Sequence, residues 1–443
     1  MKTIIQNLKN IWNVQELRTR ILLTLGLLAV YRVGSYIILP GIDKDAITAS
    51  LTKSGDSEPG LLDLLNTFSG GAFFNGAVFA LGIMPYISAS IIVQLLGFAI
   101  PYFQKLQKEG EAGQRRMNQI TRYITIAITL VQGSAYLNYM YSAFPSAISS
   151  DVGLSLFWFS NIIILTAGTV FCMWLGERIT DKGIGNGISL IITAGIIATL
   201  PQAFVGEFGN KFSSSAGGPV IFIVELAIFI LVVVSAVAIV QAVRKIQIKF
   251  AKHALGSAPS ISGLDHIPVK LNAAGVMPII FAQAIMFIPG AIGQAFGAAT
   301  DPTSFLGQLQ DFTSLPYNIV FFILVVVFTY VYTALISNPK QYEDYLKNQN
   351  AFIPNVNRGD EANFIDEVTT RITLPGSIAL AFIAILPGLA RLFLMVDINF
   401  AVFFGGTSLL IMVAVVLDTI QQINGHLAMH GFSEDTKSSR IKK

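Results

Sequence analysis

Long, unbroken runs of apolar residues follow one another along most of the chain. None of these runs alternates apolar and polar positions as a strand would, and most approach the ~20 residues that a helix needs to cross a bilayer. Lipid offers no hydrogen bonds to a backbone, so only helices and closed barrels cross it. The pattern therefore predicts ten membrane-spanning helices. Their approximate bounds are 21–39, 76–100, 123–142, 156–175, 188–204, 219–243, 274–296, 317–337, 374–393 and 399–418.

Two segments outside these spans have a different character. Residues 61–75 are half apolar and rich in Gly and Ser, and they are too short to cross a membrane alone. Within residues 1–20, Ile4, Leu8 and Ile11 fall at helical spacing, which predicts an amphipathic segment on the inner leaflet, with a frayed tail as the alternative. The polar start and the absence of a small-residue cleavage site argue against a secretory signal peptide.

The distribution of basic residues sets the direction of the spans. With a cytoplasmic N-terminus, 24 of the 29 Lys and Arg residues lie on the cytoplasmic side, and Arg32 falls inside the first span. This positive-inside bias predicts that the C-terminal tail, 419–443, is cytoplasmic too. A midpoint near residue 215 leaves five spans in each half. The second half, 216–418, would then enter the membrane inverted relative to the first, 21–215, as in many transport proteins.

Composition supports a membrane protein and argues against other classes. Of the 443 residues, 53% are hydrophobic and only 12% are charged, about half of the ~25% typical of soluble domains. The mean hydropathy of +0.64 agrees. A soluble enzyme, a nucleic-acid-binding domain and a disordered chain are therefore poor interpretations. The single cysteine, Cys172, lies in an apolar run and leaves no partner for an internal disulfide.

The spans contain little candidate chemistry. Arg32 and Glu225 lie toward outer ends of spans, where a structural role beside headgroups or neighbouring loops is the simpler interpretation. The span centres carry no ionisable residue, which weakens an ion- or proton-coupled small-solute transporter, the alternative that we keep. An intramembrane enzyme would need a nucleophile–base or metal pair in a span, and none is placed. His426 and His430 lack the glutamate of a zinc motif, and no Walker A pattern occurs, so we predict no catalytic residue, cofactor or metal.

Two predicted cytoplasmic loops, 244–273 and 338–373, are much longer than most others. Both carry basic residues and Pro or Gly turns. Such loops indicate docking to a large or acidic partner, whereas topogenic charge in a solvated loop is the plainer alternative.

Two stretches carry a resemblance to a known family. They read FALGIMPYISASIIVQLL (79–96) and WLGERITDKGIGNGISLII (174–192). With LLDLLNTFSGGAFF, KEGEAGQRRMNQITRY, PVKLNAAGVMPIIFA and FGGTSLLIMVAVVLD, they resemble the SecY family, the large subunit of the bacterial protein-conducting channel, nearly end to end. The resemblance implies an all-α polytopic fold of ten transmembrane helices in two inverted five-helix halves around a central hourglass pore. Unfolded secretory polypeptides would thread this pore, and membrane segments would leave sideways into lipid.

The resemblance also implies partners and a location. The partners are the small membrane subunits SecE and SecG, the SecA ATPase or the ribosome as cytoplasmic driver, and signal sequences and nascent polypeptides. The location is the bacterial cytoplasmic membrane, in contact with the lipid bilayer. The channel would have no catalytic residues, and its energy would come from a partner or from the membrane potential.

Two groups of residues follow from the resemblance for the pore. Six branched apolar side chains would close a neck that water leaves by dewetting; they are Ile83, Ile87, Ile188, Ile192, Ile280 and Ile411. Residues 61–75 would be a movable plug. Its expected members are Leu61, Leu65, Asn66, Phe68, Ser69, Gly70 and Gly71.

The resemblance further implies a lateral gate and a docking surface. Gln94 and Gln283 would hold the closed gate by hydrogen bonds, with bonds to their own helices as the alternative. Lys249, Lys252 and Arg358 would contact the ribosome or motor. The loops depart from the family pattern, because Ser257 and Ala258 replace an arginine pair and Asn357 stands where members usually have arginine, with Arg358 next.

Overall fold

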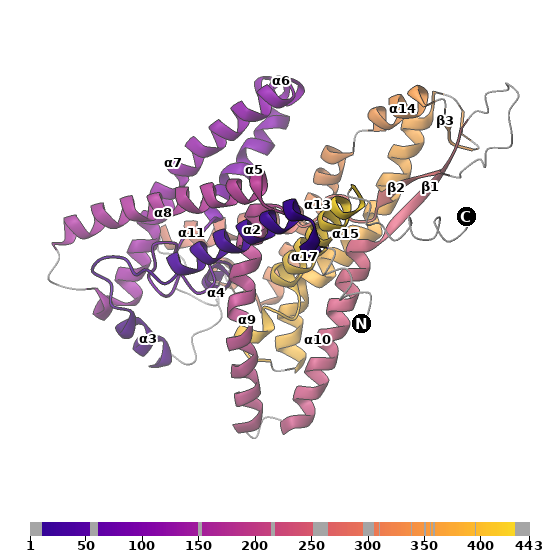
Figure 1. Cartoon of the computed structure of the whole chain (residues 1–443). Coiled ribbons are helices and arrows are strands. Elements are labelled where there is room, and N and C mark those ends of the chain that lie inside the picture. Colours follow the sequence, from indigo (N-terminus) through magenta and orange to yellow (C-terminus); the bar gives the residue numbers. More distant parts are fainter. Residues whose placement is uncertain are drawn as a thin grey trace, which may run out of the picture. The chain divides into compact units, whose positions relative to one another are not determined.

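The computed structural model of the chain is mostly helical (Figure 1). It describes residues 11–53, 61–148, 153–213, 218–250, 265–295, 305–309, 311–337, 339–349, 351–354, 356–357, 359–394 and 396–429. The chain divides into two compact units. Unit 1 comprises Met1–Val205 and Val415–Lys443, and unit 2 comprises Gly206–Ala414. The division falls inside two helices, α9 (Gly187–Ser213) and α17 (Gly406–Met429), whereas the predicted halves meet at residue 215.

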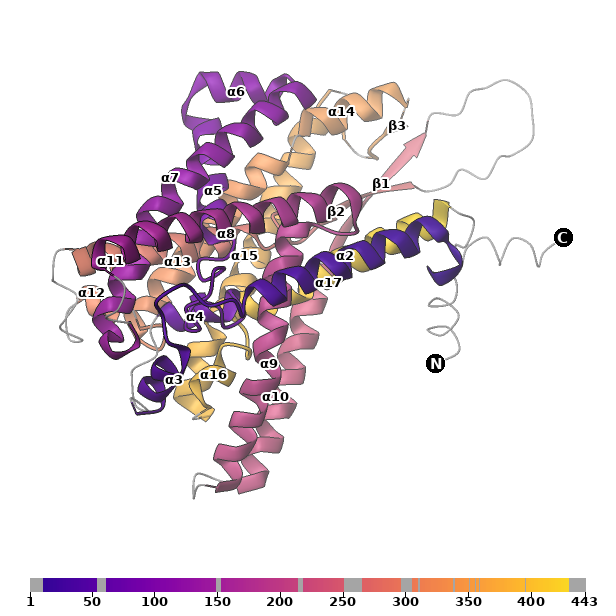
Figure 2. The same ribbon diagram turned by 60° about the vertical axis from the view of Figure 1, so that its left-hand side comes forward.

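Unit 1 holds the N-terminal helices, the first part of α9 and the last part of α17. Its other elements are α2 (Gln15–Gly34), α3 (Lys44–Lys53), α4 (Leu61–Phe68), α5 (Met84–Ala99), α6 (Pro101–Lys108), α7 (Glu111–Ala143), the short 3-10 helix η1 (Pro145–Ala147) and α8 (Leu154–Lys182). Pro101 at the first turn of α6 starts a new helix, and α5 and α6 meet at an angle of 101° (Figure 2).

The core of unit 1 joins the loop after α2, the segment after α4 and the outer ends of α7 and α8. Its fully buried side chains include Leu39, Phe73, Tyr136 and Phe157. A smaller cluster packs the start of α2 against the α8–α9 link and α17.

Unit 2 contains a second set of long helices and a small sheet. Its elements are α10 (Gly218–Gln241), β1 (Val243–Phe250), β2 (Asp265–Lys270), α11 (Met277–Ala295), α12 (Phe305–Gln308), α13 (Leu315–Ile336), α14 (Pro339–Asn348), β3 (Ala351–Phe352), α15 (Glu361–Leu394) and α16 (Ile398–Ala401), with the outer turns of α9 and the start of α17. The helices α11, α13 and α15 pack side by side in that order.

A helix overlaps each of the ten predicted spans, but not all of these helices are equally apolar. Among the described residues, six helices are long and apolar enough to cross a membrane, and a seventh is obtained if the bent pair α5–α6 counts as one broken span. Several apolar helices of this kind define a multi-pass membrane protein. The helices α2 and α7 fall short because charged and polar residues lower their hydropathy.

Two predictions about elements were wrong. The second span does not begin near residue 76: residues 76–83 form turns, and α5 begins at Met84. Gly76 and Gly82 have positive φ angles of 63° and 52°, a conformation that glycine adopts without strain and that cannot continue a right-handed helix.

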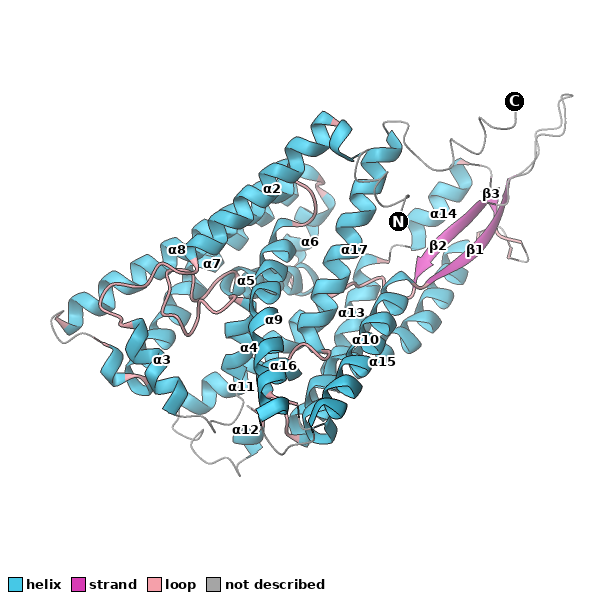
Figure 3. Ribbon diagram, turned by 60° about the horizontal axis from the view of Figure 1, so that its bottom comes forward, coloured by secondary structure: helices cyan, strands magenta, loops and turns pink. Residues whose placement is uncertain are grey.

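The chain is also not entirely helical. The two long loops form an antiparallel sheet with the strand order β2-β1-β3 (Figure 3). On one face of this sheet Ile246, Ile248 and Ile267 are buried against Leu346 of α14 and Ile365 of α15. The sheet therefore has a small hydrophobic core of its own.

Candidate functional site

The segment 61–75 consists of a short helix and a tightly bonded turn. Helix α4 ends at Phe68, and Gly70 and Gly71 follow with φ angles of 67° and 89°. Two side chains bond the turn internally: Ser69 Oγ accepts from the Phe73 N–H at 3.1 Å, and Asn66 Oδ1 accepts from the Phe74 N–H at 3.1 Å. The two glycines are thus the point at which the backbone leaves the helix, next to a turn fixed by hydrogen bonds.

Helix α4 packs less deeply than the turn that follows it. Leu64 and Phe68 are buried, but Leu62 and Leu65 are only partly buried against the core of unit 1. The side chain of Leu61 lies outside the described residues. In contrast, Ala72 is completely buried. A smaller share of the residues of α4 is therefore buried than in the turn.

Neighbouring helices donate hydrogen bonds to the main chain of this turn. Arg32 of α2 donates from Nη1 to the Gly70 carbonyl at 3.0 Å, and Tyr31 donates to the Ser69 carbonyl at a long 3.4 Å. Tyr136 of α7 donates to the Phe73 carbonyl at 2.8 Å. Arg32 thus has the structural role beside a loop that the sequence suggested. The sequence did not identify Tyr31 or Tyr136.

A glycine on α9 allows the end of α4 to approach that helix closely. A Cβ atom on Gly195 would lie 2.4 Å from the Phe68 carbonyl oxygen and 3.1 Å from the Gly70 nitrogen. The first distance is shorter than any real contact, so a side chain here would push α4 away. Gly195 is a second residue of the site that sequence reasoning missed.

The six candidate pore isoleucines come from helices of both units. Ile83 precedes the first residue of α5 and Ile87 lies one turn on, and both are buried. Ile188 and Ile192 lie one turn apart near the start of α9, and Ile192 is buried. In unit 2, Ile411 of α17 is buried and Ile280 of α11 is half-buried. Five of the six isoleucines therefore lie on helices, and Ile83 lies directly before the start of α5.

The two candidate gate glutamines have different surroundings. Gln94 donates from Nε2 to Ser90 Oγ at 3.2 Å, one turn back on α5. Gln283 of α11 is buried, with 3% of its surface exposed, and within the described residues its Nε2 has no hydrogen-bond partner. A buried amide without a partner costs about 1–3 kcal/mol, so Gln283 retains a donor for another group.

One face of the three-stranded sheet is basic. Lys245 and Lys249 alternate with the buried isoleucines of β1 and are exposed, and Lys270 of β2 is exposed as well. Lys252 and Arg358 lie outside the described residues. The sheet therefore presents Lys249 from a fixed strand and not from a free loop.

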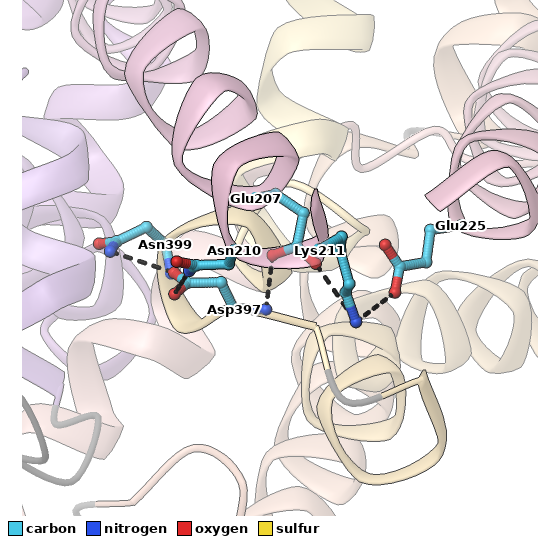
Figure 4. A network of polar contacts seen from close by, with 6 residues as sticks. All are labelled: Glu207, Asn210, Lys211, Glu225, Asp397 and Asn399. Atoms are coloured by element: carbon cyan, nitrogen blue, oxygen red, sulfur yellow. Dashed lines mark hydrogen bonds and ion pairs between the residues drawn. The ribbon is translucent and has the colours of Figure 1, made fainter. Parts of the chain in front are cut away.

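A buried polar cluster lies near the C-terminal end of α9 and the N-terminal end of α10 in unit 2 (Figure 4). The Lys211 Nζ atom lies 2.9 Å from Glu225 Oε1 and 3.5 Å from Glu207 Oε1, and the side chains are 5% exposed for Lys211 and 0% for both glutamates. Glu207 Oε2 also accepts from the Asp397 N–H at 2.8 Å. Glu225 thus has the structural role that the sequence suggested, and its partner is a lysine rather than a headgroup.

The outer loop after α15 joins the same cluster. Asp397 accepts hydrogen bonds from Asn210 at 3.0 Å and from the Asn399 N–H at 2.9 Å. The cluster therefore ties the end of α9 to α10 and to the α15–α16 link. The described residues contain no group of three His, Cys, Asp or Glu side chains arranged to hold a metal.

The fold is that of a channel. A solved structure of a protein-conducting channel matches 92% of this chain and 91% of its own length, with a TM-score of 0.63 and 18% sequence identity. A second solved structure is that of a SecY protein whose plug domain stabilises the closed state of the translocation channel and maintains a membrane seal. It matches 92% of this chain and 91% of its own length, with a TM-score of 0.61 and 19% sequence identity. Canine Sec61, in its ribosome–channel complex from the endoplasmic reticulum, matches with a TM-score of 0.61, 17% identity and the same coverages.

The family follows from the sequence comparisons. The family model SecY matches residues 77–420. The protein translocase subunit SecY of Chlamydia muridarum is 35% identical over 98% of this chain and 99% of its own length. That of Vibrio cholerae is 38% identical over 97% of this chain and 96% of its own length. The chain belongs to the SecY family, and nothing in this family name denotes a catalytic enzyme.

Proposed function

We propose that this chain is the central pore-forming subunit of a protein translocase in the cytoplasmic membrane of a bacterium. It conducts unfolded secretory polypeptides and releases membrane segments sideways into lipid. The observation that carries the proposal is the full-length match at 35–38% identity to protein translocase subunits, on a chain with a protein-conducting-channel fold. The alternative, a small-solute transporter, lacks ionisable groups at the span centres.

In this proposal the chain crosses the membrane ten times, as two inverted halves with both termini in the cytoplasm. The positive-inside bias supports this orientation. The six isoleucines meet as an apolar ring that excludes hydrated ions until a polypeptide spreads it, since an ion stripped of water has a high free energy among apolar side chains. The ring is supported by the position of the isoleucines on helices, or directly before one in the case of Ile83, and by the family resemblance.

The plug segment closes the resting channel in this proposal. Three features support it: the short partly buried helix α4, the two positive-φ glycines, and the structural likeness to a SecY protein whose plug domain maintains a membrane seal. The lateral gate opens between the helices that carry Gln94 and Gln283. The unsatisfied Nε2 of Gln283 supports a partner across the seam.

The basic sheet face with Lys249, together with Lys252 and Arg358, docks a cytoplasmic driver, either the ribosome or the SecA ATPase. Sec61, a structural relative, occurs in a complex with the ribosome, which supports that partner. SecE and SecG are proposed as the small membrane subunits from the family resemblance alone. No cofactor or metal is needed, because the energy comes from the driver or from the membrane potential.

Reconstitution tests the proposed function directly. The chain, purified with SecE and SecG, is placed in proteoliposomes with SecA, ATP and an unfolded preprotein, and the preprotein that becomes protected from added protease is measured. Protection that requires this chain and ATP supports the proposal. Uptake of small solutes without preprotein protection would favour the transporter. The matched control is the same vesicle with SecE and SecG but without the chain.

A further inference from the structure

The root of the plug segment, residues 69–73, is held by donors that bond only its main-chain carbonyls. These donors lie on either side of Gly71: Tyr31 and Arg32 reach the carbonyls of Ser69 and Gly70, whereas Tyr136 reaches the carbonyl of Phe73. A bond before Gly71 restrains the chain that leads back into α4. A bond beyond Gly71 restrains only the turn that joins the core.

The turn beyond the glycines is built to stay in place. Phe73 is buried with 4% exposure and packs edge-on against the Tyr136 ring, with centroids 4.9 Å apart. The Ala77 N–H also donates to the Ala72 carbonyl at 3.1 Å. Glycine adopts positive and negative φ with little difference in energy, so Gly71 forms the pivot about which α4 leaves while the turn remains. The bonds from the Phe73 and Phe74 N–H groups to Ser69 and Asn66 cross this pivot and open as α4 leaves.

Arg32 is the strongest donor on the side of the pivot that moves. Its guanidinium gives a charge-assisted hydrogen bond to Gly70, about twice as strong as a neutral one. A second nitrogen donates to Tyr36 OH at 3.1 Å, and the Tyr36 ring lies 5.3 Å from the guanidinium carbon. In the described part of the chain Arg32 forms no ion pair, so the Gly70 carbonyl is its principal charge-stabilising contact with the plug segment.

The absence of a side chain at Gly70 makes this contact possible. A Cβ atom there would lie 2.3 Å from Arg32 Nη1. Any side chain at position 70 would therefore displace the guanidinium, as well as strain a backbone with φ of 67°.

We propose that Arg32, supported by Tyr31, is the latch that holds α4 in the closed position, and that Tyr136 anchors the turn in both states. This inference rests on the proposed sealing role of residues 61–75. It assigns the resting balance between closed and open plug to one side chain of the first span. Arg32 is a positioning residue, which acts on the pore through the plug.

The test measures plug release separately from ion conduction. The purified complex, in nanodiscs, carries Cys172→Ala to remove the native thiol and Leu64→Cys as a probe on the buried side of α4. A water-soluble maleimide labels the probe only when α4 has left its place. Resting conductance is measured in planar bilayers with the same variants without the probe.

Arg32→Met is expected to raise the labelling rate about tenfold to a hundredfold, because the plug loses a hydrogen bond to a charged donor. Arg32→Lys keeps the charge and should restore part of the slow labelling. Tyr136→Phe is the matched control: it removes a shorter bond to the same segment beyond the pivot, and it should change labelling less than about threefold. Unchanged labelling in Arg32→Met, or equal acceleration in Tyr136→Phe, would overturn the latch.

A second variant protects the test against misfolding of Arg32→Met. Gly70→Ala leaves Arg32 in the chain but blocks its approach, and it should accelerate labelling as well. Combined with Arg32→Met it should accelerate labelling by less than the product of the two single effects, since both changes break the same contact. The part that remains is the strain of an alanine at φ of 67° and its approach to the Gly195 backbone; full additivity would refute the shared mechanism. Faster labelling without any rise in resting conductance would leave the latch intact and contradict the proposed seal.

Discussion

Replacing Lys211 by methionine tests whether the buried cluster near the outer ends of α9 and α10 stabilises the chain. Methionine keeps most of the length and apolar stem of lysine but removes the charge. Two carboxylates with no exposed surface, those of Glu207 and Glu225, would then lose their only described cation. The Asp397 N–H would remain as a donor to Glu207.

The magnitude follows from the two ion-pair distances. At an effective dielectric constant of about 20, charges at 2.9 Å and 3.5 Å attract by about 6 and 5 kcal/mol. Much of this attraction offsets the desolvation of the three groups. Removal of one partner of a buried pair has a measured cost of about 3–5 kcal/mol. We therefore expect Lys211→Met to lower the free energy of unfolding by about 3–5 kcal/mol.

Unfolding in mixed micelles, followed by far-ultraviolet circular dichroism as the denaturing detergent is increased, measures this loss. Lys182→Met at the exposed end of α8 is the matched control, and it should leave the midpoint unchanged. The double variant Lys211→Met with Glu225→Gln should regain part of the loss, because one uncompensated charge is gone. Equal stability of Lys211→Met and the control would refute the reasoning. A double variant as unstable as the single one would assign the loss to packing instead of charge.

The remaining predictions concern the ring, the docking face and helix packing. Ile411→Asn should wet the proposed neck and raise resting ion conductance severalfold in planar bilayers, and unchanged conductance would count against an apolar ring. Lys249→Glu should weaken binding of the ribosome or SecA about fivefold at low salt and less at high salt; a salt-independent affinity would move the docking site elsewhere. Gly168→Ala should lower the free energy of unfolding by about 1–3 kcal/mol, because the new Cβ would lie 2.4 Å from the Val78 carbonyl oxygen. Gly206→Ala is the control: no atom lies within 4 Å of its Cβ, so it should not lower the free energy of unfolding.

The positions of the helices could be predicted from the sequence because lipid imposes one rule on every span. A run of apolar residues has no other stable conformation in a bilayer, so each predicted span falls on a helix. The start of the second span was wrong for a local reason. Residues 76–83 are as apolar as a helix requires, and only the left-handed glycines Gly76 and Gly82 distinguish them. The positions of these two glycines were the sequence feature that could have indicated turns instead of a helix.

The cytoplasmic sheet was missed although its signal was present. The strand VRKIQIKF places Ile246 and Ile248 two residues apart, with polar residues between, which is the alternation of a half-buried strand. The lysines of the same stretch were interpreted as docking charge. A buried strand and an exposed basic face are compatible, because the two faces of a strand carry different residues.

The contacts of the plug segment show what sequence patterns leave out. Arg32 was noticed because a charge inside an apolar span is unusual, but its acceptor is a main-chain carbonyl 38 residues away, and every residue has a carbonyl. Likewise, Tyr136 bonds the carbonyl of Phe73, 63 residues earlier, and no letter of the sequence marks that choice. The glycines are the sequence feature that relates to these contacts. A Cβ at Gly70 would collide with the Arg32 guanidinium, and one at Gly195 would collide with the Phe68 carbonyl. Because main-chain acceptors do not depend on side-chain identity, substitutions along α4 can change its packing without removing the acceptors of Tyr31, Arg32 and Tyr136. If residues 61–75 act as the proposed plug, the helices that donate to its root contribute to its resting position together with the bonds that Ser69 and Asn66 form within the segment.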